Sequence, residues 1–198
     1  VSAARAATRI ISYSEKSNPI DLLIFTGVAG SVSTKLKQWD ILIADDVIQH
    51  DMDCRPLFPK YVIPSFNKSK LNTTNKWSKW LKTTLEESLK KTTINDAKFN
   101  RVYSGCIASG DQFINNKSQQ EAIKNGIPGV LAVEMEGASV AQIAYHEKID
   151  FVILRTISDN ADESASSSFE EFISLYNNFS WKIIEIVLKG IYKIHLNK

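Results

Sequence analysis

The sequence predicts an α/β fold with a mostly parallel central sheet, and three observations support this prediction. Short apolar runs alternate along the chain with segments of helical periodicity. The chain has 198 residues, 43% of them hydrophobic, which suits a single domain with one core spanning residues 1–198. Polar residues also gather where the apolar runs end, and ligands bind at that edge of such sheets.

The first part of the chain supplies a helix, two strands and a long irregular segment. Ala and Ile at helical spacing predict a helix over 2–15, which Asn18-Pro19 ends. The apolar run DLLIFTG predicts a buried strand over 21–27, and DILIADDVIQHD predicts another over 40–51. Three prolines and many polar residues predict an irregular segment over 51–75. Long loops of this kind tend to be functional or to lie at interfaces.

The rest of the chain continues the alternation and closes with a long helix. An amphipathic helix over 76–91 carries an apolar stripe that we assign to the core, formed by Trp77, Trp80, Leu81, Leu85 and Leu89. SQQEAIKNG predicts a helix with Gly126 past its end, where glycine favours a left-handed cap. The remaining expected elements are strands over 100–111, 130–135 and 150–159, and helices over 136–148 and 168–194.

The composition argues against several classes of protein. Lys and Arg number 24 against 22 Asp and Glu, a balance that does not favour nucleic acid or an anionic membrane as the main partner. The densest basic cluster, 68–91, is interpreted as a solvated loop and helix face. No apolar run approaches the length of a membrane span. Cys54 and Cys106 match no metal spacing, so we expect free thiols and no metal site.

Polar residues follow four of the expected strands. They are Thr26-Gly27, Ser109-Gly110-Asp111, Glu134 to Glu136, and Arg155 to Asp159. Each has a structural explanation when taken alone: a turn in TGVAGS, a cap at Asp159, or an ion pair of Arg155 with a glutamate. Together they converge on one edge of one sheet, and this convergence predicts a binding site.

The segments TGVAGS, SGDQFI, VEMEGASVAQ and LRTISDNADESASSSFEEF, in this order, resemble the methylthioadenosine/S-adenosylhomocysteine nucleosidases of the nucleoside phosphorylase superfamily. The resemblance covers nearly the whole chain. It implies a three-layer α/β/α sandwich around a mixed sheet, and a homodimer. The implied activity is hydrolysis of the N-glycosidic bond of 5'-methylthioadenosine and S-adenosylhomocysteine, with release of adenine. Adenine nucleosides are the implied small-molecule partners, and no cofactor is implied.

The resemblance assigns catalytic roles to Asp159, Glu136 and Arg155. Asp159 resembles the acid that protonates N7 of the departing adenine, which requires a carboxyl that keeps its proton near neutral pH. Glu136 resembles the residue that binds the ribose hydroxyls and stabilises the oxocarbenium-like sugar. Arg155 is expected to help hold the attacking water and to keep Glu136 ionised.

The resemblance also implies a set of substrate-binding residues. Phe113 and Phe169 are expected to flank the purine, Met135 to pack on the sugar, and Glu134 to orient Arg155 or bond backbone near the sugar. The full implied set is Val28, Ala29, Gly30, Phe113, Ile114, Val133, Glu134, Met135, Ser158 and Phe169.

Residues around FTGVAG bear on the choice between water and phosphate as the nucleophile. Phosphorylase relatives carry an Arg and a Ser or Thr there, because an oxyanion needs such donors. This chain has Phe25 and Val28, which favours hydrolysis, although many nucleosidases carry Ser where Val28 stands. Family members begin with a strand and a Gly-Ala-Met-x-x-Glu segment that supplies the water-activating glutamate. We expect that acid upstream of Val1, and little activity from a chain that starts there.

The loop over 51–66 is rich in apolar residues, so we expect something to cover it. In the family the corresponding loop crosses a dimer interface and completes the partner's pocket. By resemblance, Cys54, Phe58 and Pro64 fall at or near those pocket positions. Packing of the loop on its own subunit is the alternative.

Two other functions stay open at this point. One is a purine nucleoside phosphorylase, or a nucleosidase of other substrate preference, on the same fold. The other is a catalytically weak surface protein that binds glycans or proteins, supported by the Lys-rich region 68–91. A cytoplasmic location is expected, and export stays open because the native N-terminus is not seen. Release of adenine without phosphate separates these functions.

Overall fold

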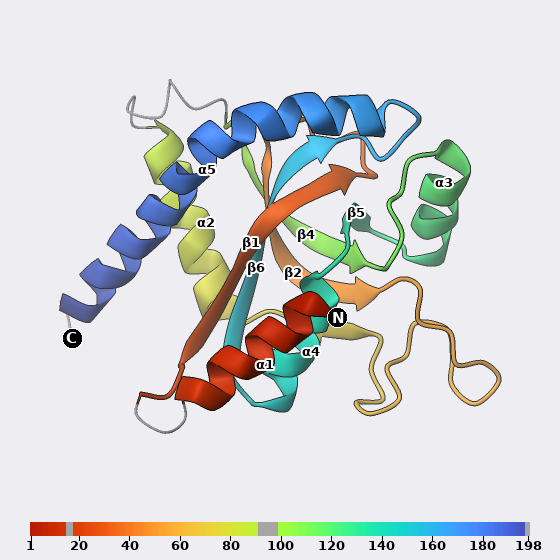
Figure 1. Ribbon diagram of the computed structural model, residues 1–198, viewed down its shortest axis with the longest axis horizontal. Coiled ribbons are helices and arrows are strands. Elements are labelled where there is room, and N and C mark those ends of the chain that lie inside the picture. Colours follow the sequence, from red (N-terminus) through yellow and green to blue (C-terminus); the bar gives the residue numbers. More distant parts are fainter. Residues whose placement is uncertain (15–17, 91–98, 197–198) are drawn as a thin grey trace.

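The structure is a computed structural model that describes residues 1–14, 18–90 and 99–196 (Figure 1). Helices and strands alternate along most of the chain, as the sequence predicts. The helices are α1 (Ser2–Ser14), α2 (Asn75–Lys90), α3 (Lys117–Gly126), α4 (Gly137–His146) and α5 (Ala165–Leu196). The strands are β1 (Leu22–Ser31), β2 (Ile41–Gln49), β3 (Lys70–Asn72), β4 (Val102–Ser109), β5 (Val130–Glu134) and β6 (Asp150–Asp159).

The strands form one mixed sheet in the order β3-β2-β4-β5-β1-β6. Strand β1 runs parallel to β6 along its length, and β4 runs parallel to both β2 and β5. Two antiparallel pairings complete the sheet: β1 meets β5 at Gly30 and Ser31, and β2 meets β6 at Ile41 to Ile43. Because β2 pairs with β6 as well as with β4, the sheet curls round on itself.

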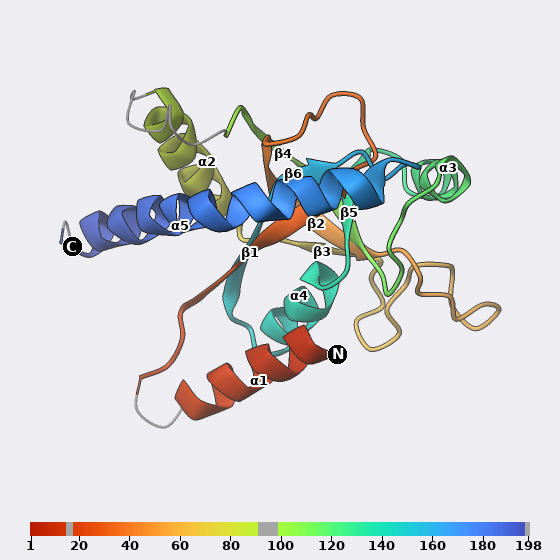
Figure 2. The same ribbon diagram turned by 45° about the horizontal axis from the view of Figure 1, so that its top comes forward.

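Helices cover both faces of this sheet (Figures 1 and 2). Helix α4 packs on one face through Ala138, Ala141 and Ala144, and α1 lies outside α4. These small side chains let the helix approach fully buried strand residues such as Ile107 and Ile153 closely. The expected α/β/α arrangement around a mixed sheet is therefore confirmed.

Helices α2 and α5 cover the other face and pack on each other. Leu81 and Leu85 of α2 are fully buried, and Trp77, Trp80 and Leu89 pack partly buried beside them. The expected apolar stripe of α2 is thus confirmed as core. Its expected end at residue 91, like the end of the first helix at residue 15, lies outside the described residues.

Three local expectations were wrong. The strand expected over 21–27 does not end at Gly27, because β1 continues through TGVAGS to Ser31, and Gly27 to Ala29 pair with Arg155 to Ile157 of β6. Gly126 is the last residue of α3, and the glycine with a left-handed backbone is Gly129, at φ 84°. The segment over 51–75 also contains β3, which pairs antiparallel with β2.

The loop over 51–66 packs partly on its own subunit. Ile63 is only 3% exposed and belongs to the core beneath α4. The ring of Phe66 lies 4.9 Å from that of Tyr145 on α4, centroid to centroid. Leu57 projects away and is 84% exposed. The loop therefore has an anchored base and an apolar tip that the described chain leaves uncovered.

Two further features concern the sequence predictions. Cys54 and Cys106 are both free thiols. None of the helices in the described ranges is long and apolar enough to cross a membrane.

Candidate active site

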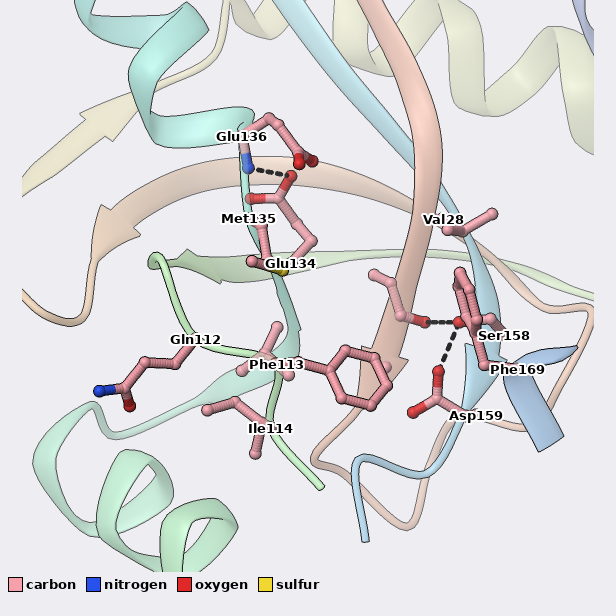
Figure 3. A pocket seen from close by; sticks show the side chains of 13 residues that line it. Val28, Gln112, Phe113, Ile114, Glu134, Met135, Glu136, Ser158, Asp159 and Phe169 are labelled. Atoms are coloured by element: carbon pink, nitrogen blue, oxygen red, sulfur yellow. Dashed lines mark hydrogen bonds between the residues drawn. The ribbon is translucent and has the colours of Figure 1, made fainter. Parts of the chain in front are cut away.

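A cavity of about 210 Å³ opens where β1, β5 and β6 end (Figure 3). Strand ends supply most of its wall, α5 contributes Phe169, and the segment after β4 contributes a loop. The lining residues are Val28, Ala29, Gly30, Gln112, Phe113, Ile114, Val133, Glu134, Met135, Glu136, Ser158, Asp159 and Phe169. Every substrate-binding residue implied by the resemblance is among them, together with Asp159 and Glu136.

Asp159 lies at the end of β6 and is only 4% exposed. Its Oδ2 accepts a hydrogen bond from Ser158 Oγ at 2.6 Å, and its Oδ1 accepts one from the backbone N–H of Ala161 at 2.8 Å. Burial nevertheless raises the pKa of Asp159 above its ordinary value, and these hydrogen bonds only oppose that shift. A buried carboxyl of this kind holds its proton to higher pH and can donate it to a bound base.

Close packing holds Asp159 in place. A Cβ atom at Gly30 would lie 2.7 Å from Asp159 Oδ1 and 3.1 Å from the Cβ of Ala161. Only glycine at position 30 of β1 leaves room for this carboxyl. The local requirement for glycine in TGVAGS is therefore steric and comes from the neighbouring strand.

Glu136 lies just before the first turn of α4, and its side chain makes no capping hydrogen bond to the helix. Figure 3 shows it on a different side of the cavity from Asp159. Burial and then the charge of Glu134 raise the pKa of Glu136, while Arg155 lowers it. Because its side chain makes no capping hydrogen bond, this carboxyl group is available to bind a ligand, such as a pair of hydroxyl groups.

Glu134 and Arg155 form a buried ion pair beneath Glu136. Arg155 Nη2 lies 2.6 Å from Glu134 Oε2, and Nε donates to the same oxygen at 3.2 Å. The ring of Phe25 lies 4.4 Å from the guanidinium carbon, and the side chain of Arg155 is 1% exposed. Arg155 is not among the residues that line the cavity. It contacts Glu134, which does line the cavity.

Glu134 also binds the start of α4. Its carboxylate accepts the N–H of Gly137 at 2.8 and 2.9 Å and the N–H of Glu136 at 3.2 Å. Both contacts considered for Glu134 from the sequence, to Arg155 and to nearby backbone, are therefore present. A negative charge at a helix N-terminus is stabilising, because the first N–H groups lack helical partners.

Two aromatic rings frame the remaining wall. Phe113 and Phe169 meet edge to face with 6.1 Å between ring centroids. Phe113 is 43% exposed and Met135 is 40% exposed, so both present apolar surface toward solvent and the cavity. A flat, partly apolar ligand fits such surroundings.

The structure adds one residue to the predicted site and places four predicted residues outside the cavity lining, namely Arg155, which lies behind Glu134, and three residues of the 51–66 loop. Gln112 lines the cavity, and its place inside SGDQFI beside Phe113 was the signal that could have identified it. Cys54, Phe58 and Pro64 do not line this cavity in the described chain. Pro64 is exposed, whereas Cys54 and Phe58 are half-buried.

The fold and the cavity at the strand ends define a member of the phosphorylase superfamily, because residues 1–189 match the model of that family. The 5'-methylthioadenosine/S-adenosylhomocysteine nucleosidase of Haemophilus influenzae (strain PittEE) is 36% identical over 88% of this chain and 70% of its own length. That of Staphylococcus haemolyticus (strain JCSC1435) is 35% identical over 96% of this chain and 77% of its own length. Within the superfamily, the chain belongs to the family of 5'-methylthioadenosine/S-adenosylhomocysteine nucleosidases.

Two solved structures illustrate the range of similar enzymes. The Neisseria meningitidis nucleosidase in complex with methylthio-immucillin-A has a TM-score of 0.82 and 30% identity, over 95% of this chain and 76% of that one. The futalosine hydrolase of Helicobacter pylori strain 26695 has a TM-score of 0.79 and 31% identity, over 94% of this chain and 74% of that one.

Proposed function

We propose that this protein hydrolyses the N-glycosidic bond of 5'-methylthioadenosine and S-adenosylhomocysteine and releases adenine. The observation that carries the proposal is the placement of Asp159 and Glu136 on different sides of one cavity, with Phe113 and Phe169 in its wall. Family membership supports the same activity, because the relatives are named 5'-methylthioadenosine/S-adenosylhomocysteine nucleosidases.

Asp159 acts as the general acid in this proposal. Adenine is a poor leaving group as an anion, and protonation at N7 lets it depart neutral. The raised pKa of Asp159, caused by burial, keeps the proton available at higher pH than for an exposed aspartate. The proton passes from the carboxyl to N7 as the bond from N9 to C1' breaks.

Glu136 binds the ribose in this proposal. A carboxylate accepts hydrogen bonds from two vicinal hydroxyl groups and stabilises positive charge as it develops on the sugar ring. Arg155 supports Glu136 indirectly. It forms an ion pair with Glu134, and the Glu134 carboxylate accepts the backbone N–H of Glu136. We therefore assign Arg155 a positioning role.

Water is the nucleophile that fits this cavity best. Among the described residues, no Lys or Arg lines the cavity to bind a phosphate. Arg155 is held by Glu134 and covered by Phe25, and Val28 offers no hydroxyl. The phosphorylase alternative therefore has less support than hydrolysis.

The proposal extends to a homodimer in which the tip of the 51–66 loop covers the partner's cavity. Its support is the 84% exposed Leu57 beside half-buried Phe58 and Cys54. A methylthio group needs apolar surroundings, since it forms no strong hydrogen bond.

We also propose a cytoplasmic location, which suits two free thiols.

The test is adenine release from 5'-methylthioadenosine in phosphate-free buffer by protein carrying its native N-terminus. Asp159→Asn should lose roughly 10²–10⁴-fold in kcat, the usual contribution of a general acid, and Glu136→Gln roughly 10²–10³-fold, as for loss of one charge-stabilising group. Glu170→Gln is the matched control, because Glu170 is exposed beside Phe169 on α5. Near-normal turnover by either cavity variant, folded as judged by circular dichroism, would overturn its assigned role.

Hydrolysis of futalosine is a second candidate function. The observation that favours it is the similarity to the Helicobacter pylori futalosine hydrolase structure, at 31% identity. The two functions are separated by comparing kcat/KM for 5'-methylthioadenosine and futalosine in one assay. A higher value for futalosine would make it the preferred substrate.

A further inference from the structure

A buried serine lies one layer behind the cavity and connects three elements. Ser109, at the end of β4, is 3% exposed and is not among the residues that line the cavity. Its hydroxyl donates to Glu134 Oε1 at the end of β5 and accepts the N–H of Ala138 in α4 at 2.7 Å. Both hydrogen-bonding functions of the hydroxyl are thus used inside the protein.

These contacts converge on the backbone of Glu136. The carboxylate of Glu134 accepts the N–H groups of Glu136 and Gly137, and Ser109 accepts the next one, that of Ala138. The side chain of Glu136 makes no capping hydrogen bond of its own. Its location therefore depends on where α4 begins, and Glu134 and Ser109 together fix that point.

We infer that Ser109 is a positioning residue that aligns the Glu136 carboxylate with the ribose hydroxyls, an inference that rests on the proposed function. Removing its hydroxyl leaves the buried Ala138 N–H without its acceptor and Glu134 without one of its donors. The start of α4 then shifts to regain partners. A small displacement of a ligand-binding carboxylate weakens the hydrogen bonds that depend on its geometry.

The experiment measures how strongly the protein distinguishes ribose from 2'-deoxyribose. The probes are an adenine C-nucleoside, whose glycosidic carbon–carbon bond is not hydrolysed, and its 2'-deoxy form, both titrated by calorimetry. Wild-type protein with its native N-terminus should bind the ribose form at least about tenfold more tightly, as expected for a hydrogen bond to a charged group. Ser109→Ala should reduce this ratio to below about threefold.

Two further variants keep the result interpretable. Ser109→Cys preserves the buried volume but replaces the hydroxyl with a weak donor, and it should lower the ratio in the same direction. Ser78→Ala is the matched control, because Ser78 is a 6% exposed serine whose hydroxyl pairs with Thr73 on the other face of the sheet. Its ratio should equal that of the wild type even if its stability falls.

The outcomes distinguish failure of this inference from failure of the proposed function on which it rests. If wild-type protein discriminates and folded Ser109→Ala or Ser109→Cys discriminates equally well, Ser109 has no positioning role. If wild-type protein does not discriminate, the role proposed for Glu136 fails and the inference fails with it. Loss of discrimination in Ser78→Ala would show that any buried hydroxyl matters equally, which also overturns the inference.

Discussion

At the scale of single residues, exposure and hydrogen bonding distinguish the two cavity carboxyl groups and support the different roles proposed for them. Asp159 is 4% exposed and held by neighbours on both oxygens, whereas the side chain of Glu136 has no capping partner. A buried acid suits proton donation, and a free carboxylate suits binding to hydroxyl groups. The division follows from position: one residue ends a central strand, and the other precedes a helix.

The raised pKa of Asp159 predicts a pH-dependent difference in stability. Because the folded pKa exceeds the unfolded value of about 3.9, the folded state binds more protons between these two values, and stability falls as pH rises through that window. Asp159→Asn has no carboxyl to deprotonate at this position, so its stability does not fall for this reason. The variant should therefore gain stability relative to wild type as pH increases from about 4 to 7, measured by urea unfolding at several pH values. A difference that is constant with pH would contradict the shift.

Gly30 offers a second prediction at this scale. An added Cβ would lie 2.7 Å from Asp159 Oδ1, so Gly30→Ala must displace that carboxyl. We expect kcat for adenine release to fall by at least about tenfold, within the range for a general acid, while the protein still folds. Gly190→Ala is the control, since its Cβ would lie equally close, at 2.7 Å, to Trp80 of α2, which does not line the cavity. Equal activity of the two variants would contradict a steric role for Gly30.

At the scale of elements, the connection from β5 to α4 is the part of the fold closest to the proposed chemistry. Glu134 ends the strand, Gly137 begins the helix, and only two residues lie between them. This short connection turns Glu134 inward to Arg155 and leaves Glu136 toward the cavity. The Glu-Met-Glu sequence thus supplies one partner of a buried ion pair and one carboxyl group that we propose binds the ligand.

The contact between α2 and α5 is set by a glycine. A Cβ at Gly190 of α5 would lie 2.7 Å from Trp80 Cζ2 and 3.3 Å from Thr84 Cγ2 of α2. Gly190→Leu should destabilise the protein by about 1–3 kcal/mol through overpacking, despite the higher helix propensity of leucine. Urea unfolding measures this, with Lys193→Leu on an exposed position of α5 as the control. Equal free energies of unfolding for the two variants would contradict the close contact.

Some elements could be predicted from the sequence and others could not. Long periodic segments such as α2, and apolar runs such as β6, carry strong local signals. The three-residue strand β3 has no such signal, because its existence depends on pairing with β2. The extension of β1 through TGVAGS was also hidden, since glycines suggest a turn until a neighbouring strand is present to pair with them.

The candidate site could likewise be predicted only in part from the sequence. Glu134 to Glu136 and Ser158 to Asp159 were predicted to meet because strand ends share one sheet edge, whereas Val28 to Gly30 and Val133 were implied only by the family resemblance. A contact between Arg155 and Glu134 was considered from the sequence, but the position of Arg155 outside the cavity lining could not be predicted, because it depends on how the strands pack. Ser109 was noted only as part of a polar strand end, and the positioning role that we infer for it depends on contacts with two other elements.

At the scale of the whole molecule, the 51–66 loop is the feature most suited to an interface. Ile63 anchors its base in the core and is 3% exposed, so a charged substitution there would unfold the protein and report nothing about association. Leu57 at the tip is 84% exposed and has no such structural function. The tip is therefore the place to test the proposed homodimer.

Leu57→Asp should dissociate the dimer and raise KM for 5'-methylthioadenosine by at least about tenfold, because a charge opposes burial against the partner's cavity. Sedimentation velocity and steady-state kinetics on the same sample measure both effects. Tyr192→Asp, at a 64% exposed apolar position on α5, is the control and should change neither. A monomeric Leu57→Asp protein with unchanged KM would rule out a shared cavity.

The central claim is that the cavity between Asp159 and Glu136 catalyses hydrolysis of an adenine nucleoside. Its most direct test is turnover of 5'-methylthioadenosine in ¹⁸O-labelled water that also contains phosphate, using protein with its native N-terminus. Mass spectrometry of the products should show free adenine and a methylthioribose that carries ¹⁸O, and Glu136→Gln should form neither at a comparable rate. A methylthioribose phosphate, or no adenine at all from the folded wild-type protein, would contradict the account.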